Sequence, residues 1–141
     1  MSSKTSTIID RIVVNASPFE VYDAFMNSKK HSEFTGSKAT GTPKEGAEFS
    51  AWDGYISGKN LELVKGKKIV QEWITTDWPK DYPPSRLELK FKDLGDKTEI
   101  SMTHSKVPAN QETSLRQGWL DFYWKPLKEY FKKQKSIKSK K

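Results

Sequence analysis

Few side chains in this sequence could take part in acid–base, nucleophilic or metal chemistry. There are two histidines, His31 and His104, and no cysteine, which excludes thiolate nucleophiles, disulfides and thiolate metal sites. His104 continues the period-2 register of Ile100 and Met102, so its ring should face the same side of a strand as those residues. A histidine in this position is either a donor or acid in a cavity wall or, more commonly, a hydrogen-bonded core residue.

Glu72 is the carboxylate that could act with His104 as an acid–base pair. It stands in the opposite register from Trp73, and the sequence alone leaves open whether it faces a cavity or solvent. No G-x-S-x-G motif, phosphate-binding loop or dinucleotide fingerprint is present. The sequence therefore predicts no catalytic residue, metal site or cofactor, and enzyme activity stays an open alternative.

Aromatic residues are the most distinctive group, with five Trp, five Tyr and seven Phe in 141 residues. Such a set can fill a core, or it can line a pocket for an apolar molecule. Composition does not separate these alternatives.

The elements that must position these residues begin with a strand over residues 5–14, which is rich in β-branched residues. The sequence Ser17-Pro18-Phe19-Glu20 is a capping box with proline at the first helical position, so a short helix should start there. A second short helix is expected over residues 29–34, ending near Gly36.

Residues 37–106 have the pattern of an antiparallel meander. Asp53-Gly54 favours a two-residue type I′ turn between strands, and further hairpins are expected at Lys65-Gly66 and across residues 93–96. Residues 77–85 contain three prolines and should form a loop.

A long amphipathic helix is expected over residues 111–132, with Asn110 as its N-cap. Gly118 and Pro126 disfavour a regular helix at this point, which predicts a close backbone approach at the first and a bend at the second. We therefore expect one domain over residues 1–131, followed by a lysine-rich, disordered and dispensable tail over residues 132–141. The alternative is that the tail continues the helix, since lysines favour a helix C-terminus.

The basic excess of the chain is local. The net charge is +7, but residues 132–141 hold six lysines, and without them 19 basic residues face 18 acidic ones. A lysine tract gives only salt-dependent attraction to polyanions, so no specific nucleic-acid binding is predicted. No signal peptide or membrane-spanning segment is found in the sequence, and we expect a cytoplasmic protein without membrane insertion.

Five short motifs occur in an order that is similar to one known superfamily. They are Ala16 to Tyr22, Asp53 to Gly58, Ile69 to Trp73, Thr98 to His104 followed by Val107-Pro108, and Gly118-Trp119. Together they resemble the START-like helix-grip superfamily, in the branch that resembles the C-terminal domain of the activator of heat-shock protein 90 ATPase.

The resemblance implies an α+β helix-grip fold, with a curved antiparallel sheet of about six strands around the long C-terminal helix and two short helices after strand one. It also implies that several side chains gather between sheet and helix as candidate ligand-binding residues: Phe34, Phe49, Trp52, Tyr55, Trp73, Trp78, Met102, His104, Trp119, Phe122 and Tyr123.

Three functions are compatible with this resemblance. The leading hypothesis is a protein that binds a small hydrophobic or amphipathic molecule in a cavity between sheet and helix. The first alternative is a chaperone-interacting protein, and the second is a cyclase-like or hydrolase-like enzyme using His104 and Glu72. The sequence leaves the oligomeric state open.

Overall fold

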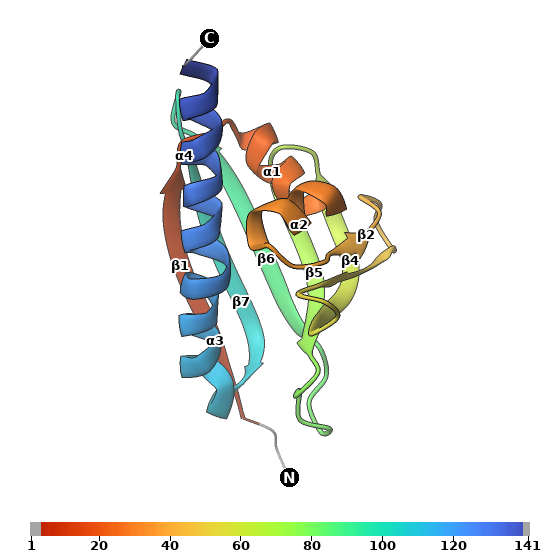
Figure 1. Ribbon diagram of the computed structural model, residues 1–141. Helices are drawn as coiled ribbons and strands as arrows, with labels where there is room; N and C mark the ends of the chain where they lie inside the picture. Colours follow the sequence, from red (N-terminus) through yellow and green to blue (C-terminus); the bar gives the residue numbers. More distant parts are fainter. Residues whose placement is uncertain (1–3, 140–141) are drawn as a thin grey trace.

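A computed structural model describes residues 4–139 and shows a curved antiparallel sheet next to a long C-terminal helix (Figure 1). Among these residues the sheet has seven strands in the order β1-β7-β6-β5-β4-β3-β2. The strands are β1 (Thr5–Val14), β2 (Thr40–Gly41), β3 (Glu48–Ala51), β4 (Ile56–Val64), β5 (Lys68–Thr75), β6 (Ser85–Asp93) and β7 (Thr98–Pro108). The predicted α+β helix-grip fold is confirmed, with the two-residue β2 as an added edge strand.

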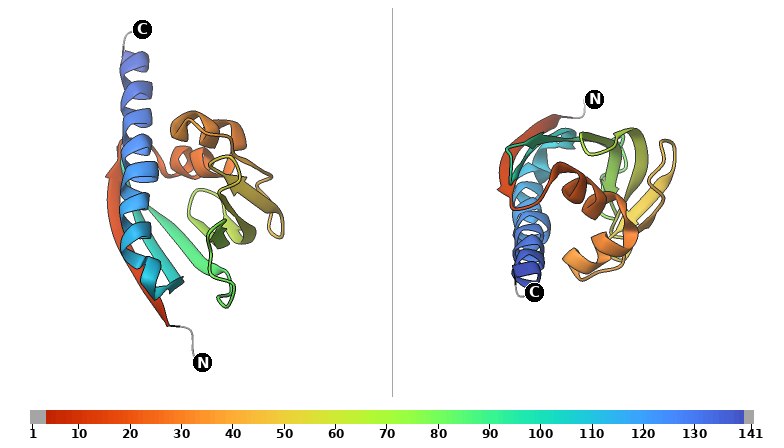
Figure 2. Two further views of the ribbon diagram at one scale, coloured as in Figure 1. Left: turned by 60° about the horizontal axis from the view of Figure 1, so that its bottom comes forward. Right: turned by 90° about the horizontal axis from the view of Figure 1, so that it is seen from above.

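The helices lie on the concave side of the sheet (Figure 2). They are α1 (Pro18–Met26), α2 (Ser28–Thr35), the 3-10 turn η1 (Ala109–Gln111), α3 (Glu112–Trp119), the π-helical turn η2 (Leu120–Trp124) and α4 (Lys125–Ser139). No helix in residues 4–139 is both long and apolar enough to cross a membrane.

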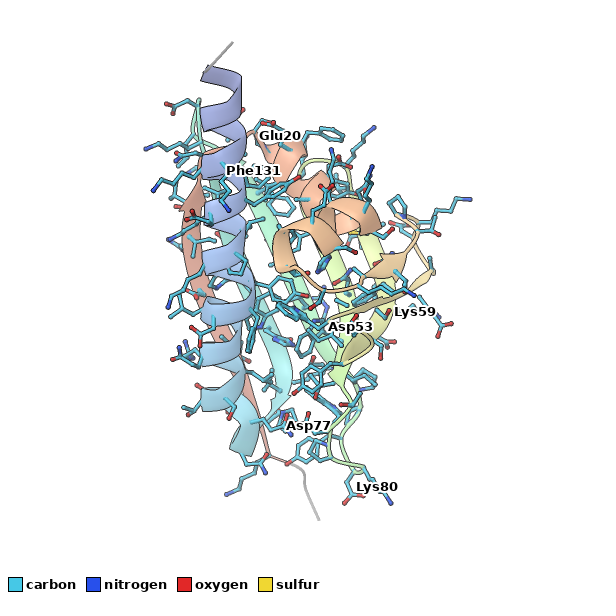
Figure 3. All side chains as sticks on the ribbon, viewed as in Figure 1. Glu20, Asp53, Lys59, Asp77, Lys80 and Phe131 are labelled. Atoms are coloured by element: carbon cyan, nitrogen blue, oxygen red, sulfur yellow. The ribbon has the colours of Figure 1, made fainter. Side chains whose placement is uncertain are left out.

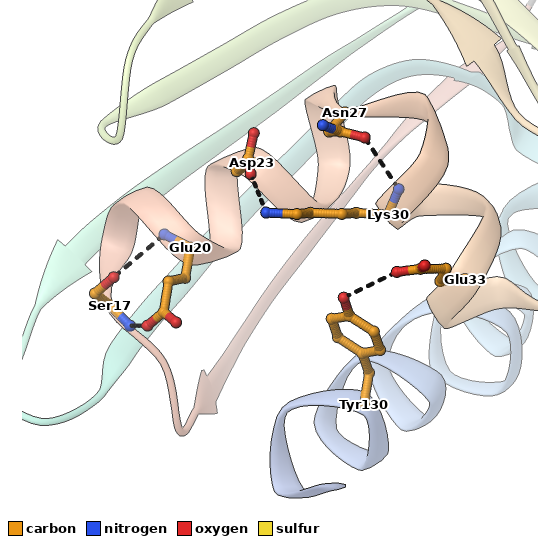
Figure 4. Close-up of polar contacts among 7 residues, drawn as sticks. All are labelled: Ser17, Glu20, Asp23, Asn27, Lys30, Glu33 and Tyr130. Atoms are coloured by element: carbon orange, nitrogen blue, oxygen red, sulfur yellow. Dashed lines mark hydrogen bonds and ion pairs between the residues drawn. The ribbon is translucent and has the colours of Figure 1, made fainter. Parts of the chain in front are cut away.

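The predicted capping box starts α1, because Ser17 Oγ accepts from Glu20 N at 3.2 Å and Glu20 Oε1 accepts from Ser17 N at 3.0 Å (Figure 4). Asn27 then caps α2 by accepting from Lys30 N at 3.1 Å. Tyr130 of α4 donates to Glu33 of α2 at 3.3 Å. The caps fix the starts of the two short helices, and the Tyr130–Glu33 bond connects α2 to the long helix.

The turn between β3 and β4 differs from the predicted two-residue type I′ turn. Ala51 pairs with Ile56, so four residues form the loop, and Trp52, Asp53 and Gly54 have φ values of 52°, 56° and 89°. A tryptophan in the left-handed region is unusual and costs conformational energy. The longer loop carries the Trp52 ring toward the C-terminal helix, where it contacts the ring of Phe122 at a centroid distance of 5.2 Å.

The C-terminal helix also differs from prediction. Its first α-helical segment is preceded by η1, and neither Asn110 nor Gln111 provides a side-chain cap. Pro126 has no N–H and crowds the carbonyl four residues earlier, which explains why the chain widens into the π-helical turn η2 just before it. The expected boundary at residue 131 does not interrupt the helix, since α4 continues to Ser139; residues 140–141 lie outside the described part.

The core forms where the concave face of the sheet meets this helix. The alternation predicted for β6 and β7 is confirmed, because Leu87, Leu89, Ile100 and Met102 are each at most 2% exposed. At the free edge of the sheet, β1 presents Ile9 and Val13 to solvent on the convex face. Burial of one face against the helix leaves the convex face without a covering layer (Figure 2).

Candidate functional site

His104 lies at the centre of a fully buried hydrogen-bond chain. Its Nδ1 accepts from Trp119 Nε1 at 3.1 Å, so the ring proton is on Nε2, which donates to Ser85 Oγ at 2.7 Å. Ser85 in turn donates to the carbonyl oxygen of Trp73 at 2.7 Å. Every polar atom of the imidazole is therefore used in holding β6, β7 and α3 together.

Burial lowers the pKa of His104 to about 3, which keeps the ring neutral at physiological pH. The candidate acid–base pair does not form. Trp73, Gln71 and Ile69 line the inner side of β5, so the alternation of the strand places Glu72 on the convex side, away from His104. Of the two alternatives for His104, the geometry matches the hydrogen-bonded core residue.

Aromatic rings fill most of the space between the sheet and the helix. Trp119 stacks on Trp73 at a centroid distance of 5.9 Å and on Trp124 at 5.1 Å, and it contacts Tyr123 at 4.7 Å. The cavity left inside has a volume of about 30 Å³, which is enough for roughly one water molecule. This interior is a packed core rather than a large ligand cavity.

An open groove of about 470 Å³ lies next to this packed core, between the β3–β4 loop and helices α3 and η2. Its wall contains six of the predicted site residues, namely Trp52, Tyr55, Trp73, Trp119, Phe122 and Tyr123. Five of them are contributed by the β3–β4 loop and the C-terminal helix, and Phe122 is 53% exposed at the rim. The groove is hereafter called the aromatic groove.

A few polar groups are placed around the aromatic groove. Tyr55 donates its hydroxyl to Asp77 Oδ1 at 3.1 Å, and Gln111 Nε2 donates to the Asp77 carbonyl oxygen at 3.2 Å. The hydrogen bond from Thr75 holds the pKa of Asp77 below its ordinary value, and burial raises the pKa of Tyr55. The carboxylate of Asp77 is thus fixed in its charged form at one end of the groove.

Trp52 carries the unusual polar atom of this site. Its indole Nε1 is buried and forms no well-aligned hydrogen bond with the described residues, and its polar interaction is with the Tyr123 side chain. A buried donor without any hydrogen bond costs about 1–3 kcal/mol, and the interaction of Trp52 with Tyr123 offsets part of that cost. Next to it, Tyr123 donates to His31 Nε2 at 3.1 Å, and burial lowers the pKa of His31 and raises that of Tyr123.

The other predicted site residues are not part of the aromatic groove's wall. Phe34 is in a cluster with His31 and Tyr123, while Phe49 borders the small inner cavity. Trp78 is in the loop after β5, where its Nε1 donates to the Pro83 carbonyl oxygen at 3.0 Å. Met102 and His104 are buried in the core.

Sequence reasoning missed several residues of the groove wall: Ile56, Asp77, Gln111, Ser114, Leu115 and Gly118. Leu115, Gly118 and Phe122 follow one another at helical spacing, and this periodicity could have placed them on the same helix face. The close backbone approach predicted for Gly118 is wrong, because an added Cβ would meet only Phe122 Cδ2 at 3.7 Å. Asp77 gives no comparable signal, since it lies in an irregular loop.

Comparison with known proteins gives a family match over residues 15–132, to the family described as activator of Hsp90 ATPase homolog 1-like protein. A human protein named activator of 90 kDa heat shock protein ATPase homolog 1 is 34% identical over 115 residues, which are 82% of this chain and 34% of that protein. A Dictyostelium discoideum homologue of the same activator is 32% identical over 116 residues, with 82% and 30% covered. The chain thus spans about a third of the length of these relatives.

Solved structures agree with this fold. The crystal structure of an HSP90 activator from Plasmodium falciparum has a TM-score of 0.77 and 24% identity, with 83% of this chain and 89% of that chain covered. The solution structure of an Aha1 dimer from Colwellia psychrerythraea has a TM-score of 0.76 and 18% identity, with 89% and 96% covered. At these identities the likeness establishes the helix-grip architecture.

Proposed function

Because this chain belongs to the family of activator of Hsp90 ATPase homolog 1-like proteins, we propose that it binds a chaperone of the 90 kDa heat-shock class and stimulates its ATPase. The observation that carries this proposal is the extent of the match. Residues 15–132 include α1, α2, the strands β2 to β7 and the helix up to the middle of α4. The relatives named as ATPase activators therefore share the folded body rather than one local motif.

The described geometry favours this proposal over an enzyme. His104 is fully engaged in hydrogen bonds, and Glu72 lies on the other side of the sheet. Within residues 4–139 there is also no group of three or more metal-ligating side chains. A protein that acts by binding a partner through its surface needs neither an acid–base pair nor a metal site.

The proposal is tested by titrating the purified chain into a purified HSP90-class chaperone. We expect a complex in analytical ultracentrifugation and a concentration-dependent rise in the steady-state ATPase rate. The rate that remains with a competitive inhibitor of the chaperone's nucleotide site is subtracted as background. This inhibitor blocks ATP hydrolysis by the chaperone and leaves hydrolysis by any contaminating ATPase. An unchanged rate and two separately sedimenting species would refute the proposal.

A second candidate function is the binding of a small apolar or amphipathic molecule in the aromatic groove. It is supported by the volume of about 470 Å³, the aromatic wall and the polar groups of Tyr55, Asp77 and Gln111 in its lining. Ligand sites of this size are mostly apolar with a few placed polar groups. A planar molecule with one hydrogen-bond acceptor has the matching chemistry.

Gly118 offers a specific test of this second candidate, since its position in the groove wall has room for a side chain. We expect native mass spectrometry to show a retained adduct, or a panel of fatty acids and flavonoids to raise the melting temperature. Gly118→Leu should abolish either effect, whereas Gln117→Leu, on an exposed neighbouring position, should preserve it. Equal responses of both variants would exclude the groove as the binding site.

A further inference from the structure

A second depression, on the outer surface at the other end of the molecule, combines basic and apolar side chains. It has an open volume of about 910 Å³ and is formed by the start of α1, the β4–β5 turn, the end of β6 and the start of β7. In Figure 3 this end is marked by Glu20, next to Phe19 in the chain, while Asp77 of the aromatic groove lies at the opposite end. The two surfaces are therefore separate.

The exposed large apolar side chains of this depression are Phe19 and Val64. Their side chains are 46% and 40% exposed, and no other described element covers them. The α1 capping box holds the backbone at Phe19, and the β4–β5 turn packs close to it, since a Cβ added at Gly66 (φ 73°) would lie 3.6 Å from Phe19 Cα. The backbone that carries the exposed ring is thus held from two sides.

Five lysines surround these apolar side chains: Lys65, Lys67, Lys68, Lys90 and Lys92. Two of them are engaged with acids outside the depression, Lys68 with Glu62 at 3.2 Å and Lys90 with Glu88 at 3.4 Å. The other three form no ion pair among the described residues. Two carboxylates, Asp93 and Glu99, also belong to the rim, and Glu99 stands opposite Lys92 in the β6–β7 register.

Lys65 and Lys67 are exposed cations in the β4–β5 turn, beside the apolar centre. Lys65 Nζ lies 5.2 Å from the centroid of the Phe19 ring, which places an ammonium group beside an exposed aromatic surface. Lys67 follows two residues later in the same turn. A carboxylate that pairs with either lysine would bring the neighbouring side chain of its own peptide onto Phe19.

We propose that the depression around Phe19 docks an acidic segment of a partner protein that carries an apolar side chain among its carboxylates. The positive excess of the rim attracts the acids, and Phe19 with Val64 receives the apolar side chain. This inference deepens the proposed chaperone contact and rests on it for the class of partner.

The surface fits a peptide better than a nucleic acid or an anionic membrane. A phosphate polymer is bound by a continuous run of cations, whereas Asp93, Glu99 and the paired Glu62 and Glu88 interrupt the lysines here. A spaced set of cations around an apolar centre instead matches a segment in which spaced carboxylates flank one apolar side chain.

The test uses a fluorescent synthetic peptide of alternating glutamate and serine with one central leucine, titrated with the full chain. Binding should weaken at least about tenfold for the Lys65→Glu/Lys67→Glu variant and for Phe19→Ala, and also when the leucine of the peptide is replaced by serine. The matched control is Lys29→Glu/Lys38→Glu, which makes the same change in net charge at exposed positions outside the depression and should bind within about twofold of wild type.

Circular dichroism and thermal melting verify that each variant is folded. Absence of peptide binding by the wild-type chain, equal loss in the control variant, or tighter binding of a DNA duplex or phosphatidylserine vesicles to the same lysines would overturn the proposal. Chaperone binding is measured in parallel on the same variants. If the peptide binds at Phe19 and the chaperone does not bind, the proposed function fails while the docking surface remains.

Discussion

At the residue scale, His104 shows how a potentially reactive side chain is used for structure. Its two ring nitrogens bond Trp119 and Ser85, and these bonds connect the helix to two strands. Protonation would place a second N–H on the ring and point it at the Trp119 donor, which breaks one bond and buries a charge. The folded state therefore requires the imidazole ring of His104 to be neutral.

This leads to a prediction for the pH dependence of stability. The pKa of His104 is about 3 in the folded state, against an ordinary value of about 6.5 in the unfolded chain. Between these values only the unfolded chain binds the proton, so the free energy of unfolding should fall as the pH falls below about 6.5, by up to about 1.4 kcal/mol per pH unit for each such group. His31, whose pKa is also lowered by burial, acts in the same direction.

Urea unfolding between pH 6.5 and 5, above the range where most carboxylates titrate, measures this slope. His104→Leu should reduce the slope and also lower the stability at pH 7 by about 1–3 kcal/mol, because Trp119 and Ser85 lose their partner. Ser85→Ala keeps the titrating ring, so it should lower stability while the slope persists. A slope that is the same in wild type and His104→Leu would contradict this role.

At the scale of secondary-structure elements, we expect alanine to have opposite effects on stability at two glycines. An added Cβ at Gly118 in α3 has room, and alanine is the better helix former, so Gly118→Ala should stabilise the protein by up to about 1 kcal/mol. In β4, a Cβ at Gly58 would lie 1.8 Å from the Glu72 carbonyl oxygen. Gly58→Ala must therefore displace β5 or distort the sheet.

Thermal unfolding of the two variants side by side tests this pair. We expect the melting temperature to rise for Gly118→Ala and to fall for Gly58→Ala, with the same substitution chemistry in each. A loss of stability in Gly118→Ala would show that the wall of the aromatic groove is more tightly packed than an added Cβ contact of 3.7 Å implies.

At the scale of the whole molecule, the C-terminal helix closes the core. Among the side chains of this helix that the structure describes, the buried ones are Trp119, Tyr123, Trp124, Leu127 and Phe131, each at most 5% exposed. Deleting residues 111–141 removes all of them and should unfold the protein, as seen in the loss of near-UV circular dichroism. Deleting residues 132–141 removes none of them and should leave the melting temperature nearly unchanged.

The state of the lysine-rich end is a separate prediction at this scale. We expect fast amide exchange after Phe131, since it is the last buried apolar side chain among those that the structure describes in the helix, and the following lysines repel one another. The alternative to a disordered tail is a longer helix, and α4 continues to Ser139 in the structure. Amide protection that persists beyond Lys138 would contradict the disordered tail.

The sequence determined the elements and their order because these depend on local chemistry. The capping box at Ser17, the alternation in β6 and β7 and the spacing of Trp119, Tyr123 and Leu127 each reflect interactions among neighbours along the chain. It also placed His104 on the buried face. Five motifs in order then pointed to the helix-grip fold, which the structure and the comparisons confirm.

Tertiary structure alone decided what those elements build. The four-residue loop at Trp52, the π-helical turn before Pro126 and the convex position of Glu72 result from packing between segments far apart in sequence. The same packing fills the interior with aromatic rings and leaves the aromatic groove and the depression around Phe19 at opposite ends. Local patterns indicate which residues are apolar or charged, but only long-range contacts decide which of them are covered.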